Sequence, residues 1–174
     1  CFPMIGFGQN VYIPDANFKA YLVGNTAINT NGDAEIQVSE ATVFNGDIYC
    51  QGMSIADLTG IEAFTALTYL NCEDNQLTSL DISNNLALNS INCSNNQLTS
   101  IDVSAATALI NLQCYDNQLT SLNINQNTAL IYLYCSYNQI ISLDISQNPS
   151  LISLNCSYNQ LVSLDVRNGN NIII

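Results

Sequence analysis

Residues 67–85 read LTYLNCEDNQLTSLDISNN, and the same pattern returns four more times at intervals of 21 residues. The later copies are LNSINCSNNQLTSIDVSAA (88–106), LINLQCYDNQLTSLNINQN (109–127), LIYLYCSYNQIISLDISQN (130–148) and LISLNCSYNQLVSLDVRNG (151–169). A period of this length is typical of a solenoid, in which each short unit buries its apolar face only when neighbours stack on it. Residues 67–171 are therefore predicted to form five stacked repeats.

Each copy carries apolar residues at positions one, four, six, eleven, fourteen and sixteen. They fall in two short segments, LxC and LDI, whose inward side chains lie two residues apart, as in half-buried strands. The sequence thus predicts a β-rich solenoid with short parallel strands on two faces of one core. Position nine is predicted to form an asparagine ladder that bonds buried backbone groups at the bend. Its members are Asn75, Asn96, Asn117, Asn138 and Asn159.

Two further segments precede the regular repeats. Residues 45–66 match the apolar pattern over 22 residues and are predicted to be a divergent first repeat whose second half holds a short helical turn. Residues 10–44 are predicted to cap the solenoid. Within them Pro14 and Asp15 predict the start of a short helix that ends before Gly24. Its predicted apolar face carries Phe18, Tyr21 and Leu22. Such a helix is suited to cover the open end of the core.

The two ends of the sequence differ from the repeats. Residues 1–9, CFPMIGFGQ, are interpreted as a signal-peptide remnant, with the mature protein beginning near Gln9. The alternative is a short disordered or β-like N-terminus. Residues 172–174 supply the start of a sixth repeat, so we expect a chain that is truncated at both ends. A secretory signal predicts a secreted or cell-surface protein.

Residues 29–40, NTNGDAEIQVSE, can be laid on the twelve-position calcium loop of an EF-hand. The predicted ligands are the side chains of Asn29, Asn31, Asp33 and Glu40 and the carbonyl of Glu35. The match is partial, because asparagine replaces the first aspartate and Ala34 stands where glycine normally makes the sharp turn. The alternative is a polar connection whose Asx side chains bond their own backbone. Calcium is the only cofactor that the sequence suggests.

Composition excludes several function classes. The chain carries a net charge of −12, with only Lys19 and Arg167 as cations, so it has little with which to neutralise phosphate groups. Nucleic acid and anionic membrane surfaces are therefore not expected partners. The chain contains no histidine, which removes the commonest general base. An apolar content of 48% excludes a disordered polar chain and predicts one folded domain.

Cysteine occupies position six throughout the repeats. Exported proteins often contain disulfides, so disulfides between these cysteines have to be considered. Neighbouring parallel strands, however, hold their Cβ atoms about 4.8 Å apart and pointing the same way, and a disulfide cannot bridge them without distortion. A one-dimensional stack also lacks the tetrahedral convergence of a zinc site. We expect reduced thiols that act as small buried hydrophobes. These residues are Cys50, Cys72, Cys93, Cys114, Cys135 and Cys156.

Position fifteen carries a row of acidic or amide side chains on the outer side of the LDI segment. Carboxylates about 5 Å apart fall near the spacing of retaining glycosidases. They lie on an exposed face with no cleft to raise one pKa, however, so a solvated acidic stripe is predicted and no catalytic residue is assigned. The row consists of Asp81, Asp102, Asn123, Asp144 and Asp165.

The solvent-facing positions of the LxC segment change along the chain. In the early copies they are mostly small, polar or acidic, whereas the later copies carry several tyrosines. Exposed tyrosines on a rigid sheet offer a large contact area at low entropic cost, which protein and glycan binding sites require. The alternative is that aromatic residues merely suit strands. The predicted ligand-binding residues are Tyr115, Tyr132, Tyr134, Tyr137 and Tyr158.

The repeats resemble those of bacterial leucine-rich-repeat proteins of the 21-residue class, LxxLxCxxNxLxxLDLxxNxx, and residues 45–66 resemble an internalin-like first repeat. The resemblance implies a secreted or surface module that recognises an extracellular protein or glycan. The function predicted from the sequence is therefore binding through the exposed face of the main parallel sheet, without catalysis or membrane insertion. The alternative is a structural spacer or adhesin stalk that presents another domain.

Overall fold

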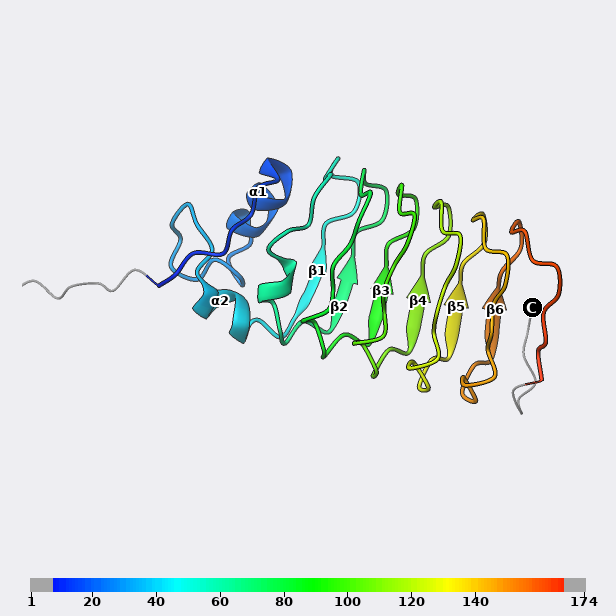
Figure 1. The fold of residues 1–174 in the computed structure, drawn as a ribbon. Helices are drawn as coiled ribbons and strands as arrows, with labels where there is room; N and C mark the ends of the chain where they lie inside the picture. The colour runs from blue at the N-terminus through cyan, green and yellow to red at the C-terminus, as the bar shows by residue number, and fades with distance from the viewer. Residues whose placement is uncertain (1–7, 168–174) are drawn as a thin grey trace, which may run out of the picture.

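A six-stranded parallel sheet runs along the molecule (Figure 1). The computed structural model describes residues 8–167, and each coil contributes one three-residue strand. Neighbouring strands pair in sequence order, so that Leu70 of one coil lies beside Ile91 of the next. The strands are β1 (Asp47–Tyr49), β2 (Tyr69–Asn71), β3 (Ser90–Asn92), β4 (Asn111–Gln113), β5 (Tyr132–Tyr134) and β6 (Ser153–Asn155).

The core lies inside the coils and is continuous from one to the next. In the first regular coil Leu70, Cys72 and Leu77 are fully buried, and Ile82 is 1% exposed. Burying one aliphatic side chain stabilises the fold by about 1.5–3 kcal/mol, and only stacking covers both sides of a coil. The predicted parallel solenoid is thus confirmed.

The prediction of strands on two faces is wrong. Among residues 8–167 the only sheet is that of β1–β6, and the LDI segments are not strands although their apolar residues are buried in the first four regular copies. The reason lies at position fifteen, where the Oδ1 atom accepts a hydrogen bond from the backbone N–H two residues later. This Asx turn bends the chain directly after the segment. It recurs at Asp81, Asp102, Asn123, Asp144 and Asp165.

The N-terminal cap contains two helices. Helix α1 (Ala16–Gly24) begins after Asp15, whose side chain accepts hydrogen bonds from the N–H groups of Asn17 and Phe18. Phe18 and Leu22 are fully buried, so the predicted apolar face is confirmed. Helix α2 (Val38–Val43) begins within the last three residues of the predicted calcium loop and so contains Glu40. A 3-10 turn, η1 (Ile61–Ala63), occupies the second half of the divergent repeat as expected.

Position nine forms the predicted ladder. Asn138 accepts a hydrogen bond from Leu119 N–H at 2.9 Å and donates to the carbonyl of Cys114 at 2.9 Å, which ties its coil to the preceding one. The same Nδ2 atom also donates to the carbonyl of Cys135 within its own coil. Equivalent bonds link Asn75, Asn96, Asn117 and Asn159 to their preceding coils.

A second asparagine ladder, which the sequence analysis missed, lies at position nineteen. Asn127 is fully buried and donates to the carbonyls of Val103 and Ala106. Asn85 and Asn148 make corresponding bonds, whereas the second copy has Ala106 at this position. Alanine at position nineteen of the second copy and glycine, Gly169, in the fifth disguised the pattern, because a residue type that is absent from two of five copies looks like ordinary variation.

Most of the predicted signal-peptide remnant and the start of the sixth repeat lie outside the described residues. Within residues 8–167, no helix has the length and apolar character needed to cross a membrane.

Candidate binding face on the parallel sheet

The bend that follows each strand places position eight in a left-handed backbone conformation. The φ angles lie between 52° and 54° at Asp74, Asn95, Asp116, Tyr137 and Tyr158. Aspartate and asparagine are the side chains that tolerate this conformation best after glycine, whereas a bulky residue there is an outlier. Tyr137 and Tyr158 therefore have a strained backbone. At the same position the three preceding regular coils have aspartate or asparagine, which suit this conformation.

Tyr137 and Tyr158 stack on each other at the C-terminal end of this row. Their ring centroids are 4.3 Å apart and the planes are inclined by 11°. Even so, 49% of Tyr137 and 70% of Tyr158 remain exposed. The pair is a rigid aromatic surface that the fold holds open to solvent.

A shallow hollow of about 400 Å³ adjoins this pair on the face of β4, β5 and β6. Tyr137 lines the hollow, whereas Tyr158, which stacks on Tyr137, is not one of its lining residues. The residues that line the hollow are Gln113, Tyr115, Asp116, Tyr134, Ser136, Tyr137 and Asn155.

The structure thus brings together three of the five predicted tyrosines, Tyr115, Tyr134 and Tyr137, in one hollow. Tyr158 joins them through its stack, whereas Tyr132 lies on the other outward row of β5 and does not line it. The polar members of the hollow were missed. The sequence did contain a signal for Asp116, because it occupies position eight in the copy directly before those that carry Tyr137 and Tyr158.

The expectation that aromatic residues gather on one flank is incomplete. Tyr49 and Tyr69 form an edge-to-face pair at the opposite end of the sheet, with ring centroids 5.2 Å apart. The backbone N–H of Tyr49 also bonds to the hydroxyl of Tyr21 in α1, so this pair lies next to the cap. Between the two aromatic ends the outward residues of β3 and β4 are polar.

Tyr115 is oriented by a carboxylate two coils away. Its hydroxyl donates to Glu73 Oε1 at 2.5 Å, and this hydrogen bond raises the pKa of Tyr115 to about 12. Glu73 also accepts from the side-chain amides of Asn92 and Asn95. The network spans three consecutive coils and fixes one wall of the hollow.

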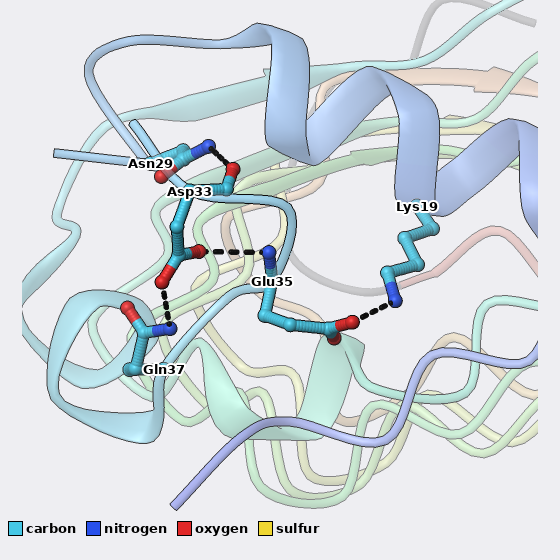
Figure 2. Close-up of polar contacts among 5 residues, drawn as sticks. All are labelled: Lys19, Asn29, Asp33, Glu35 and Gln37. Carbon is cyan, nitrogen blue, oxygen red and sulfur yellow. Dashed lines mark hydrogen bonds and ion pairs between the residues drawn. The ribbon is translucent and has the colours of Figure 1, made fainter. Parts of the chain in front are cut away.

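The predicted calcium ligands lie in a loop that its own hydrogen bonds close (Figure 2). Asn29 donates to the carbonyl of Asp33 at 2.7 Å, and Asp33 accepts from Glu35 N–H and from the side chain of Gln37. The carboxylate of Glu35 is turned away from the loop and pairs with Lys19 at 2.7 Å.

Glu40 would be the bidentate calcium ligand, but both of its oxygens already accept donors. Oε1 accepts from the N–H groups of Thr30 and Asn31 and from the Thr30 hydroxyl, and Oε2 accepts from Gln37 N–H. Desolvation opposes ionisation of Glu40, yet these hydrogen bonds lower its pKa overall. The described residues contain no group of three or more acidic, histidine or cysteine side chains placed to hold a metal. As arranged, the carboxylates of Asp33 and Glu40 accept hydrogen bonds from the chain itself, so calcium would have to displace these donors. Calcium binding stays a prediction.

The six cysteines of the described coils are free thiols, and all except Cys156 are buried. Burial raises the pKa of Cys50, Cys93 and Cys135 to about 12. These side chains act as small apolar groups of the core, as predicted.

The acidic stripe is exposed, as expected, and it has a local structural role that the sequence analysis did not assign. Hydrogen bonds from Ser83 lower the pKa of Asp81, and hydrogen bonds from Ser104 lower that of Asp102. Depressed values suit carboxylates that remain ionised in Asx turns and do not suit a general acid.

Comparisons with known proteins agree with the repeat pattern. No protein-family model matches the chain. Internalin J of Listeria monocytogenes is 38% identical over 77 residues, which are 44% of this chain and 8% of internalin J. A solved structure of the functional domain of internalin J, which includes a cysteine ladder, superposes with a TM-score of 0.75 at 33% identity. That alignment covers 94% of this chain and 41% of the domain.

Two further solved structures share the fold at lower identity. Internalin F of Listeria monocytogenes has a TM-score of 0.66 at 22% identity, covering 92% of this chain and 55% of that one. A leucine-rich-repeat protein of Leptospira interrogans has a TM-score of 0.64 at 22% identity, covering 66% of this chain and 32% of that one. The chain therefore spans only part of each of these relatives. Its repeat sequence, its cysteine ladder and its fold make it an internalin-like leucine-rich-repeat solenoid, homologous to internalin J.

Proposed function

We propose that this chain is an extracellular protein-binding module, secreted or held at the bacterial surface. Its partner docks on the outward face of β4–β6, around Tyr137 and Tyr158. The homology to internalin J supports export, and the aromatic face supports binding rather than catalysis.

One observation carries the proposal, namely that two consecutive coils place tyrosine where the backbone is left-handed. A bulky side chain in this conformation costs about 1–2 kcal/mol relative to a relaxed backbone. Asp74 and Asn95 show which residues suit the position. Strain of this kind persists in proteins mainly at functional sites, because substitutions that relieve it are easily reached.

The exposed pair has the properties of a protein-binding hot spot. Tyrosine combines a large apolar ring with a hydroxyl, and each residue has few rotamers to lose on binding. The stack of Tyr137 on Tyr158 restricts the rings further, so a partner meets a preorganised surface. A spacer or stalk has no use for such a surface, and the exposed rings therefore favour a binding module over the structural alternative.

The test uses the whole chain on arrays of purified extracellular proteins and of glycans. We expect capture of a protein, and we expect the double variant Tyr137→Asn, Tyr158→Asn to lose that capture. Asparagine is chosen because Asn95 occupies the same position with the same backbone. The control is Tyr12→Ser, which removes a tyrosine that is 75% exposed but lies before α1, away from the sheet.

Three results would contradict the proposal. Equal capture by the double variant and the wild-type chain would place the binding site elsewhere. Capture of glycans alone would assign the face to carbohydrate. Absence of any capture by the wild-type chain would favour the spacer.

A further inference from the structure

The hollow beside Tyr137 combines aromatic rings with one carboxylate. Tyr115, Tyr134 and Tyr137 supply the rings, and Asp116 supplies the charge. Asp116 is exposed and immediately precedes Tyr137 in the position-eight row. An aromatic wall with an adjacent carboxylate attracts cations, because the ring faces are electron-rich and the carboxylate adds a full negative charge.

Within residues 8–167, no cationic side chain pairs with Asp116 in the hollow. The ion pairs among residues 8–167 join Lys19 to Glu35 in the cap and Arg167 to Asp165 after the last coil. Both cations are thus engaged away from the hollow, and Asp116 has no cationic partner within the described part of the chain. With a net charge of −12 the protein as a whole favours a basic partner.

We propose that the hollow binds an arginine side chain of the partner protein, a refinement that rests on the proposed function. The guanidinium lies against Tyr137, which stacks with Tyr158, and pairs with the carboxylate of Asp116. Its planar shape allows ring stacking and a two-bond contact with a carboxylate at the same time, which the compact ammonium of lysine does not.

The remaining lining residues complete the recognition. A guanidinium carries five N–H donors, and a carboxylate satisfies only two of them in the paired geometry. Gln113 and Ser136 line the same hollow and offer side-chain oxygens as further acceptors. The volume of about 400 Å³ accommodates a side chain of this size. Arginine is therefore the natural residue that best matches the charge, shape and donor count of the site.

The probe for this proposal is N-acetyl-arginine amide, titrated into the isotopically labelled chain and followed by NMR. We expect millimolar binding, with shifts confined to the residues of the hollow. The analogue N-acetyl-citrulline amide has nearly the same shape without the charge and should bind about tenfold more weakly. The variant Asp116→Asn should weaken arginine binding by about the same factor, and Asn95 shows that asparagine fits this backbone.

The matched control is Asp102→Asn, which removes the same charge from an Asx turn outside the hollow and should leave binding unchanged. Asn123 occupies the equivalent position in the next coil and makes the same turn. Equal binding of the citrulline analogue, or equal binding by Asp116→Asn, would overturn the proposal. Equal binding of N-acetyl-lysine amide would overturn the choice of arginine.

The failure of this inference can be separated from failure of the proposed function. If a captured protein depends on Tyr137 and Tyr158 but arginine amide neither binds nor competes with it, the arginine site is wrong and the binding face stands. If capture is also independent of the tyrosines, both proposals fail.

Discussion

At the scale of single residues, the asparagine at position nine joins its coil to the preceding one by donating one hydrogen bond to that coil and accepting another from it. Asn138 accepts from Leu119 N–H through Oδ1 and donates to the Cys114 carbonyl through Nδ2. An aspartate lacks the donor, and an alanine lacks both groups. This double requirement explains why the residue does not vary among the five copies.

We predict that Asn138→Ala lowers the free energy of unfolding by about 3 kcal/mol, since buried backbone groups in two coils lose their partners. Chemical denaturation measures the change. The control is Asn125→Ala, which removes an exposed asparagine side chain of the preceding coil and should cost little. If Asn138→Ala lowers the free energy of unfolding no more than the control does, water must supply the hydrogen bonds that Asn138 makes in the ladder.

The residue scale also shows where prediction from sequence succeeded and where it failed. The asparagine ladder was predictable because Asn138 and its equivalents recur in every copy. The left-handed backbone at Tyr137 was not, because tyrosine gives no indication of a positive φ. The positive φ is indicated only by the aspartates and asparagine at the same position of the other copies, Asp74, Asn95 and Asp116. These residues are easily overlooked, because the repeat pattern is defined by its buried positions and position eight is not one of them.

At the scale of elements, the two apolar segments of each coil have the same alternation but different structures. The LxC segment forms a strand, whereas the LDI segment is bent by the Asx turn of its central aspartate. Periodicity identified the inward side chains of both correctly. It could not distinguish a strand from a short extended segment, because that depends on whether neighbouring backbones reach hydrogen-bonding distance.

The cysteine ladder gives a prediction for the strand side of the core. Only the thiolate reacts rapidly with alkylating agents, and burial raises the pKa of Cys93 to about 12. Among the six cysteines of the described coils, we therefore expect Cys156, which is only partly buried, to be alkylated first in the native chain at pH 8. Peptide mass spectrometry after brief iodoacetamide treatment gives the order, with the denatured chain as control. Uniform labelling of Cys72–Cys135 in the native chain would contradict the buried ladder.

The first turn of α2, with the loop that Glu40 closes, gives a second prediction at this scale. Because Glu40 already accepts hydrogen bonds at both oxygens, we expect Glu40→Gln to lower the Tm by a similar amount in millimolar calcium and in chelator. Calorimetry in the two buffers measures the difference. A calcium-dependent rise in the Tm of the wild-type chain that the variant lacks would instead establish the EF-hand-like site.

At the scale of the whole molecule, the sheet presents two aromatic ends separated by a polar middle. Tyr49 and Tyr69 lie near the cap, and Tyr137 stacks with Tyr158 near the other end. The solenoid itself was predictable from its 21-residue period. The hollow was not, because its lining residues come from three coils and become neighbours only through stacking in register.

The same scale explains why strained residues can be tolerated. Each coil is stabilised by the burial of several aliphatic side chains, and a strain of about 1–2 kcal/mol at one bend is small against that total. The regular positions therefore maintain the fold, and the positions that depart from the pattern are available for binding. We infer that Tyr137 and Tyr158 are retained for contact with a partner at some expense in stability.

The most direct test is the Kd of the Tyr137→Asn, Tyr158→Asn double variant for the protein that the wild-type chain captures. Relief of backbone strain should offset the lost ring stack, so the Tm should not fall. We expect a Kd at least about tenfold higher than that of the wild-type chain, because two hot-spot aromatics are lost. An unchanged Kd would contradict it.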